Sequence, residues 1–155
     1  MKKKTKIILL CLLTAVLTGG GYVFYLWNMP HIDVQGQKAD YSISASQLVN
    51  EYLTNEKSAN AKYLGENGES KIIVINGTIG KIDTDMNNQK VILLKNDTAR
   101  AGVSCTFMES TNKNVNALKI GDKTKIKGII RSGARYDQDM EIYVNVVLEK
   151  CDISN

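Results

Sequence analysis

Apolar residues change their spacing twice along this chain. Residues 7–27 form a run of 21 residues without a charge. Beyond residue 44, apolar residues recur at the three-to-four-residue spacing of an amphipathic helix. From Lys71 onward they alternate with polar residues, which is the period of a half-buried β-strand. The pattern predicts a hydrophobic N-terminal segment, then one helix, then a domain made mainly of strands.

The predicted helix has a well-marked start. Ser44 and Gln47 have the spacing of a capping box, and Ile43 and Leu48 fall at the positions of a hydrophobic staple. The apolar stripe that follows runs through Tyr52 and continues loosely toward residue 63. Gly65 is typical of a helix C-terminus. We therefore expect a single helix between residues 44 and 65 that packs on the strands after it.

Five strands are predicted in the remainder, at residues 71–82, 89–95, 101–108, 121–131 and 141–151. In the first, isoleucines alternate with polar residues around Gly77, and a glycine inside so long a strand indicates a bulge or sharp bend. In the third, Val103, Cys105 and Phe107 share one face. In the fifth, the predicted core face runs from Ile142 through Val144 to Val146 and Leu148. Residues 131–139 read as a turn.

The order of these elements favours one fold class. A bent first strand, five strands in all and a polar, irregular connection at residues 109–118 are typical of a small closed barrel of the OB type. Closure would also remove the unpaired edges that five short strands otherwise expose. The expected fold is therefore mainly β: a five-stranded OB-type barrel preceded by one α-helix.

Several stretches, in this order, resemble a known family: ISASQLVNEYLTNEKSANAKYLG, KIIVINGTIGKI, VSCTF, LKIGDKTKIKGII and VVLEKC. The family is the tRNA_anti-like group of bacterial OB-fold proteins, many of which carry an export signal or a membrane anchor. The resemblance covers residues 40–153 and implies the OB fold. The family name records structural kinship with anticodon-binding OB folds, and the resemblance brings neither RNA binding nor catalytic residues with it.

The N-terminal segment has two interpretations. Its 21 uncharged residues would span about 30 Å as a helix, the thickness of a bilayer core. Lysines at positions 2, 3, 4 and 6 place the preceding end in the cytoplasm and the domain across the membrane. An uncleaved anchor would end at Trp27; a signal peptide would end near residues 19–21 and release an exported domain. We prefer the anchor, because cleavage would leave the apolar stretch YVFYLW exposed.

These boundaries divide the chain into three parts. Residues 1–27 are the signal anchor or signal peptide, residues 28–42 a polar linker, and residues 43–153 the OB-like domain with its leading helix. The net charge of +4 belongs to the first part, because sixteen basic and sixteen acidic residues lie from Ile32 onward. A general nucleic-acid binder usually has a basic domain. The neutral domain therefore makes nucleic acid an unlikely partner.

The stretch GDKTKIKGIIR carries the one basic row of the domain. Lys123, Lys125 and Lys127 share a face of the fourth strand, and Arg131 follows them. The row is either a solvated face, which we prefer, or a site for an anion or nucleic acid. Single-strand binding needs aromatic platforms as well as charge, and Tyr143 is the one exposed strand tyrosine expected. The leading hypothesis is a binding module for a protein, glycan or small anion; the alternative is nucleic-acid binding through these lysines.

Covalent and metal chemistry have little support. Cys105 and Cys151 lie in the predicted non-cytoplasmic domain, where they can form a disulfide or remain buried thiols. The acidic turn DTDMNN begins like a calcium loop but lacks the glycine and glutamate that such a loop needs at its sixth and twelfth positions. The only histidine, His31, lies in the linker, so no nucleophile in the domain has the usual base. We expect no enzyme activity, no cofactor and no metal.

Overall fold

The structure, a computed structural model, describes residues 18–25, 34–64 and 70–154. Two compact units divide the chain, residues 1–33 and residues 34–155. Most of the predicted anchor or signal peptide and the start of the predicted linker lie outside the described residues. Residues 18–25 are helical. Among the described residues, no helix combines the length and the apolar character needed to cross a membrane.

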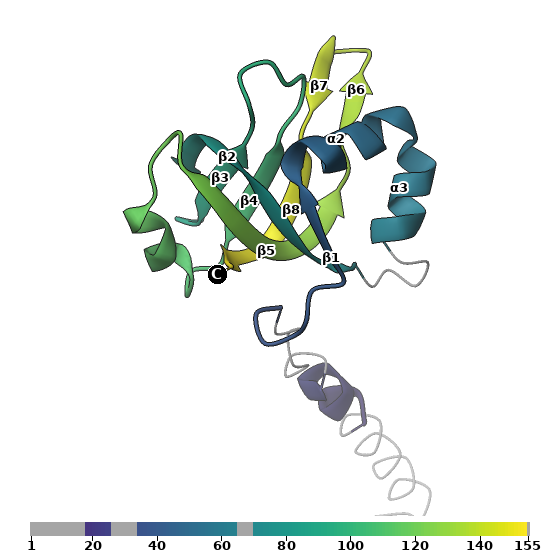
Figure 1. Ribbon diagram of the computed structural model, residues 1–155. Coiled ribbons are helices and arrows are strands. Elements are labelled where there is room, and N and C mark those ends of the chain that lie inside the picture. The colour runs from purple at the N-terminus through teal and green to yellow at the C-terminus, as the bar shows by residue number, and fades with distance from the viewer. Residues whose placement is uncertain (1–17, 26–33, 65–69, 155) are drawn as a thin grey trace, which may run out of the picture. The chain divides into compact units, whose positions relative to one another are not determined.

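Strands and helices of the second unit follow one another in a fixed order. They are β1 (Tyr41–Ser44), α2 (Ala45–Thr54), α3 (Glu56–Tyr63), β2 (Ile72–Thr84), β3 (Lys90–Leu94), β4 (Val103–Phe107), the 3-10 helix η1 (Asn112–Ala117), β5 (Lys123–Ser132), β6 (Arg135–Asp137), β7 (Ile142–Val144) and β8 (Val146–Ile153). Figure 1 shows the strands curling into a barrel, with α2 and α3 packed beside it.

Five of these strands close the barrel. Strands β2, β3, β4, β8 and β5 pair in that order, and β5 pairs back onto β2. All these pairs are antiparallel except β4 with β8. The predicted five-stranded OB-type barrel is confirmed. Strand β2 pairs with β5 along its first half and with β3 along its second half. It can do so because it is 13 residues long and its register shifts between Ile79 and Lys81, at Gly80.

The barrel core follows the predicted alternation. Ile73, Ile75 and Ile79 of β2 are buried, as are Ile126 and Ile130 of β5. Every second residue of β4, from Val103 to Phe107, is buried as well. Burying a side chain of this size stabilises the fold by about 1.5–3 kcal/mol relative to leaving it exposed. The period-two pattern therefore gave the correct inward face for these three strands.

The single predicted helix is wrong, although its start is confirmed. The backbone N–H of Gln47 donates to Ser44 Oγ at 3.2 Å, and Ser44 N–H donates to Gln47 Oε1 at 3.3 Å. The helix then breaks at Asn55, which leaves helical geometry with φ −155° and ψ 89°. Its side chain accepts from Ser58 N–H at 3.0 Å and so caps a second helix, α3. Asparagine favours such a cap over a helix interior.

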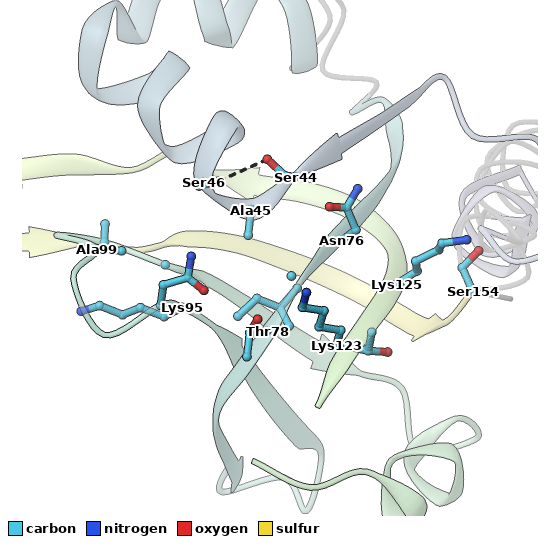
Figure 2. Close-up of a pocket in the computed structure, with 16 residues that line it drawn as sticks. Ser44, Ala45, Ser46, Asn76, Thr78, Lys95, Ala99, Lys123, Lys125 and Ser154 are labelled. Carbon is cyan, nitrogen blue, oxygen red and sulfur yellow. Dashed lines mark hydrogen bonds between the residues drawn. The ribbon is translucent and has the colours of Figure 1, made fainter. Parts of the chain in front are cut away.

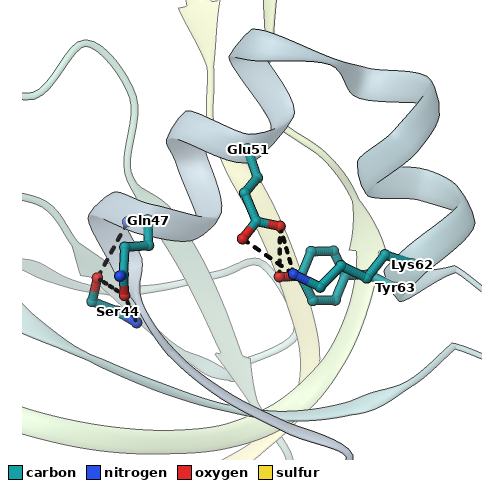
Figure 3. Close-up of polar contacts among 5 residues, drawn as sticks. All are labelled: Ser44, Gln47, Glu51, Lys62 and Tyr63. Atoms are coloured by element: carbon teal, nitrogen blue, oxygen red, sulfur yellow. Dashed lines mark hydrogen bonds and ion pairs between the residues drawn. The ribbon is translucent and has the colours of Figure 1, made fainter.

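A polar cluster joins the two helices. Glu51 of α2 accepts hydrogen bonds from Lys62 Nζ at 2.9 Å and from the Tyr63 hydroxyl at 2.8 Å (Figure 3). Burial raises the pKa of Glu51, but these two hydrogen bonds outweigh it, so the pKa lies below its ordinary value of 4.5. Tyr63 also stacks on Tyr52, which is buried. The cluster holds α3 against α2 and keeps both beside the barrel.

The predicted fifth strand is wrong in its first half. It divides at Asn145 into β7 and β8, and β7 pairs with β6 as a separate two-stranded hairpin. The Asn145 side chain accepts from Gly102 N–H at 2.8 Å, which fixes the division. Ile142 is therefore 49 % exposed, whereas Val146 and Leu148 are buried as predicted. The predicted turn over residues 131–139 contains β6 because this local pairing satisfies its backbone.

Part of the predicted linker is folded. Val34 is buried, and Gln35 Nε2 donates to the backbone oxygen of Lys150 at 3.0 Å. Strand β1 then pairs in parallel with β2, from Tyr41 opposite Ile73. The folded unit thus begins upstream of the predicted boundary at residue 43, and the leading element is a strand rather than the helix alone.

Candidate anion-binding groove

A groove of about 590 Å³ opens where the partners of β2 change. Strand β1 pairs with β2 as far as Asn76, and β3 pairs with β2 from Ile79 onward. Gly77 and Thr78 lie between these two pairings and line the groove. The other walls are the N-terminal turn of α2, the loop of residues 95–102 after β3, and the first residues of β5.

Small residues keep this space open. The groove is lined by Ala45, Gly77, Ala99, Ala101 and Gly102, none of which extends beyond a methyl group. A Cβ added at Gly77 would lie 3.2 Å from the Cβ atoms of both Ala45 and Leu94. A Cβ added at Gly102 would lie 2.7 Å from the backbone oxygen of Leu94. A side chain at Gly102 would therefore collide with the backbone of the groove wall, and one at Gly77 would press against Ala45 and Leu94.

Three lysines supply the charge of the groove. Lys123 is paired with Thr78, and Lys125 is paired with Asn76, so these side chains share the outer face of the barrel. Lys95 comes from the loop after β3. Figure 2 shows Lys123 in the middle, next to Thr78, with Lys95 and Lys125 extending toward opposite sides. Lysines from β5 and from loop 95–102 therefore lie along the groove.

The surroundings leave this positive charge uncompensated. Among the described residues that line the groove there is no carboxylate and no aromatic side chain. None of the three lysines forms an ion pair with a described carboxylate. Asp122, next to Lys123 in the chain, accepts the backbone N–H of Lys119 at 2.9 Å instead. The remaining polar lining consists of Ser44, Ser46, Asn76, Thr78, Asn96, Thr124 and Ser154.

The structure brings together two of the predicted site residues and separates the rest. Lys123 and Lys125 line the groove, and both are exposed. Lys127 instead donates from Nζ to the backbone oxygens of Gln35, at 3.0 Å, and of Gln37. These hydrogen bonds hold the segment that leads into β1 against β5. Arg131 lies outside the groove, with its Nε 3.8 Å from Glu149 Oε1.

Tyr143 also lies outside the groove, on the β6–β7 hairpin. Its ring centroid is 4.9 Å from that of Tyr136, which is 46 % exposed. Arg100 lies over the Tyr143 ring, with its guanidinium carbon 5.6 Å from the centroid, and donates to the hydroxyl at 3.3 Å. The hairpin thus carries two tyrosines where the sequence indicated one. Loop 95–102 connects the two regions, since Ala99 lines the groove and Arg100 contacts Tyr143.

Sequence reasoning missed Lys95, Asn76 and Thr78. A signal for the last two was present, because they alternate with the predicted core residues of β2 and must face outward. The fact that Lys123 and Lys125 pair opposite them depends on the register of β2 with β5. Lys95 follows the predicted second strand, and only the path of loop 95–102 brings it to the groove.

The two cysteines of the domain are neighbours in the core. Cys105 and Cys151 are both fully buried and are free thiols in this structure. Burial is the main cause that raises the pKa of Cys151 well above its ordinary value, and a hydrogen bond with Cys105 raises it further. Such thiols are poor nucleophiles in the folded protein. The disulfide stays a prediction.

The acidic turn after β2 forms a hairpin turn. Asp85 Oδ1 accepts the backbone N–H groups of Asn87 and Gln89, both at 2.8 Å. Asp83 pairs with Lys81 at 2.6 Å. Across the described part of the chain, no three histidine, cysteine or acidic residues gather in a way that could hold a metal ion.

A barrel closed by five strands in this order, with a polar groove beside its first strand, defines an OB-fold domain. The model of the tRNA_anti-like family matches residues 1–145, and the chain belongs to that family. No curated protein matches the chain.

Solved structures with a similar fold share little sequence with this chain. One is a putative nucleic acid-binding lipoprotein from Klebsiella pneumoniae, with a TM-score of 0.54, 18% identity, and coverage of 77% of this chain and 100% of that one. Another is the S. pombe Stn1–Ten1 complex, with a TM-score of 0.36, 16% identity, and coverage of 57% and 62%. The first of these likenesses supports the fold.

Proposed function

We propose that this protein is a non-enzymatic OB-fold binding module, held at a membrane by its N-terminal segment with the domain on the non-cytoplasmic side. Its ligand is an anion bound in the groove between α2, β2, β5 and loop 95–102. The observation that carries this proposal is that Lys95, Lys123 and Lys125 line one groove without a described carboxylate beside them.

The attraction is local. The sixteen positive and sixteen negative charges from Ile32 onward cancel, so no long-range field draws anions to the domain. At physiological salt the Debye length is about 8 Å, which confines each lysine to the ligand that it touches. A groove lined by lysines supplies more of that contact than a flat lysine row would, because its walls exclude part of the bulk water around an anion. The expected affinity is therefore moderate and sensitive to salt.

Pyrophosphate is a suitable probe for this proposal. Full-length protein in a neutral detergent should bind it, as measured by isothermal titration calorimetry, and binding should weaken as sodium chloride is raised. The double variant Lys123→Gln, Lys125→Gln should lose most of this binding. Lys113→Gln is the matched control, because Lys113 is exposed on η1 and does not line the groove. Equal affinities for the double variant and the control would refute the groove as the site.

A second candidate function rests on the β6–β7 hairpin. Tyr136, Tyr143 and Arg100 together form an aromatic and cationic surface of the kind that stacks single-stranded bases. This candidate ranks second, because the lysine groove has no aromatic lining and the domain is neutral. Tight binding of single-stranded RNA or DNA, abolished by Tyr143→Ala and by the double lysine variant alike, would promote it above the first.

Membrane attachment has its own test. The supporting observation is the row of four lysines before 21 uncharged residues. We expect the protein to sediment with membranes, and added protease to reach the domain from the non-cytoplasmic side only. A soluble mature form that begins near Tyr22 would replace the anchor with an exported domain, and the groove proposal would stand unchanged.

A further inference from the structure

We propose that the groove ligand is a phosphate ester of a small polyol, either a soluble ester or the headgroup of a membrane lipid. This proposal rests on the proposed anion-binding function and narrows it. Two features of the groove carry it: the chemistry of its donors and the volume left beyond its charges.

The donors favour a tetrahedral anion. Arginine forks match carboxylate and phosphate through two parallel hydrogen bonds, and no arginine is among the described residues that line the groove. Lysine is a point charge with three rotatable donors and is a common phosphate ligand. The Thr78 side chain lies next to Lys123, so a hydroxyl donor accompanies the ammonium group. A phosphate monoester carries a charge of about −1.5 to −2, and the groove is lined by lysines of the opposite charge.

The volume calls for an organic part. A groove of about 590 Å³ is in the range of small-molecule sites and exceeds what one phosphate group fills. The residues available to this organic part are small or carry hydroxyl and amide groups, such as Ser44, Asn76 and Asn96. The absence of aromatic residues from the described lining disfavours a flat base, which would need a stacking partner. A chain of hydroxyl-bearing carbons meets both conditions.

Three small probes separate the contributions. Glycerol 3-phosphate carries both the phosphate and the polyol, glycerate replaces the phosphate by a carboxylate, and glycerol has no charge. Calorimetry on the full-length protein in neutral detergent should give at least about tenfold tighter binding of glycerol 3-phosphate than of glycerate. Glycerol should not bind. Lys123→Gln should abolish the preference, and the control Lys113→Gln should keep it.

A second variant tests the volume without changing charge. Ala99 is half-buried in loop 95–102, and Ala99→Leu should fill part of the groove. It should weaken binding of glycerol 3-phosphate by about tenfold while leaving inorganic phosphate nearly unchanged. Thermal unfolding of both variants checks that the fold is kept. Equal loss for the two probes, or no loss for either, would overturn the assignment of the polyol to the groove.

Binding measured in nanodiscs distinguishes a soluble ester from the headgroup of a membrane lipid. Weaker apparent binding of glycerol 3-phosphate in discs that contain phosphatidylglycerol than in discs of phosphatidylcholine supports the proposal and identifies the headgroup as the occupant. Equal binding in both discs supports it and identifies the soluble ester. If glycerate and glycerol 3-phosphate bind equally well, this inference fails and anion binding stands. If pyrophosphate does not bind at all, the proposed function fails with it.

Discussion

One added methyl group at Gly133 should destabilise this protein through a single neighbour. Gly133 follows β5, and an alanine Cβ there would lie 2.0 Å from Cε1 and 2.1 Å from Cδ1 of Tyr52. Tyr52 is only 1 % exposed and belongs to α2, the helix whose first turn lines the groove. Its ring cannot swing into solvent without leaving the core. Gly133→Ala must therefore displace either α2 or the start of the β6–β7 hairpin.

The size of the effect follows from two bounds. Overpacking a core costs about 1–3 kcal/mol, and losing the whole packing of a large aromatic costs about 3–5 kcal/mol. Replacing glycine by alanine also restricts the unfolded chain, and this lowers the destabilisation by about 0.4–1 kcal/mol. Gly133 is not in the left-handed region, so backbone strain adds nothing. We expect Gly133→Ala to lower the free energy of unfolding by about 1.5–3 kcal/mol.

A double-mutant cycle tests the cause. Urea unfolding, followed by far-ultraviolet circular dichroism, is measured for Gly133→Ala in the wild-type and in the Tyr52→Ala background. Without the ring, Gly133→Ala should cost less than about 0.5 kcal/mol, because the two changes act on one contact. Tyr52→Val serves as the background if Tyr52→Ala is too unstable to measure. The same cost in both backgrounds would refute the collision with Tyr52.

Three further predictions concern polar groups. Because the pKa of Glu51 is lowered in the folded protein, its carboxylate stabilises the fold above its unfolded pKa of 4.5, and this stability disappears as the pH falls through the folded pKa. Glu51→Gln should therefore lower the free energy of unfolding most at pH 7, and the loss should shrink as the pH falls below 4.5. A loss that does not depend on pH would contradict this. Lys127→Gln should speed amide hydrogen exchange at residues 34–37, because Lys127 holds the carbonyls of Gln35 and Gln37. Unchanged exchange would show that these two hydrogen bonds do not stabilise the segment. Alkylation of denatured, non-reduced protein counts free thiols: protection of Cys105 and Cys151 would establish the disulfide, and full labelling of both would exclude it.

The sequence by itself determined the local features of this protein. Alternation of apolar residues gave the inward faces of β2, β4 and β5, because side chains on a strand point to opposite sides in turn. The capping box at Ser44 gave the start of α2, because its two hydrogen bonds join residues only three positions apart. Charge counting placed the net positive charge in the leader. Each of these needs only neighbours along the chain.

Only the tertiary structure decided the rest. Strand β1 has four residues and no distinctive pattern, and it is a strand because the edge of β2 offers it backbone partners. Lysines of the same strand have different roles because residues distant in sequence lie beside them. Lys127 donates to the carbonyls of Gln35 and Gln37, whereas Lys123 lines the open groove. Lys95 joins that groove through the path of a loop. Contacts between residues far apart in sequence depend on register and closure, which no local spacing encodes.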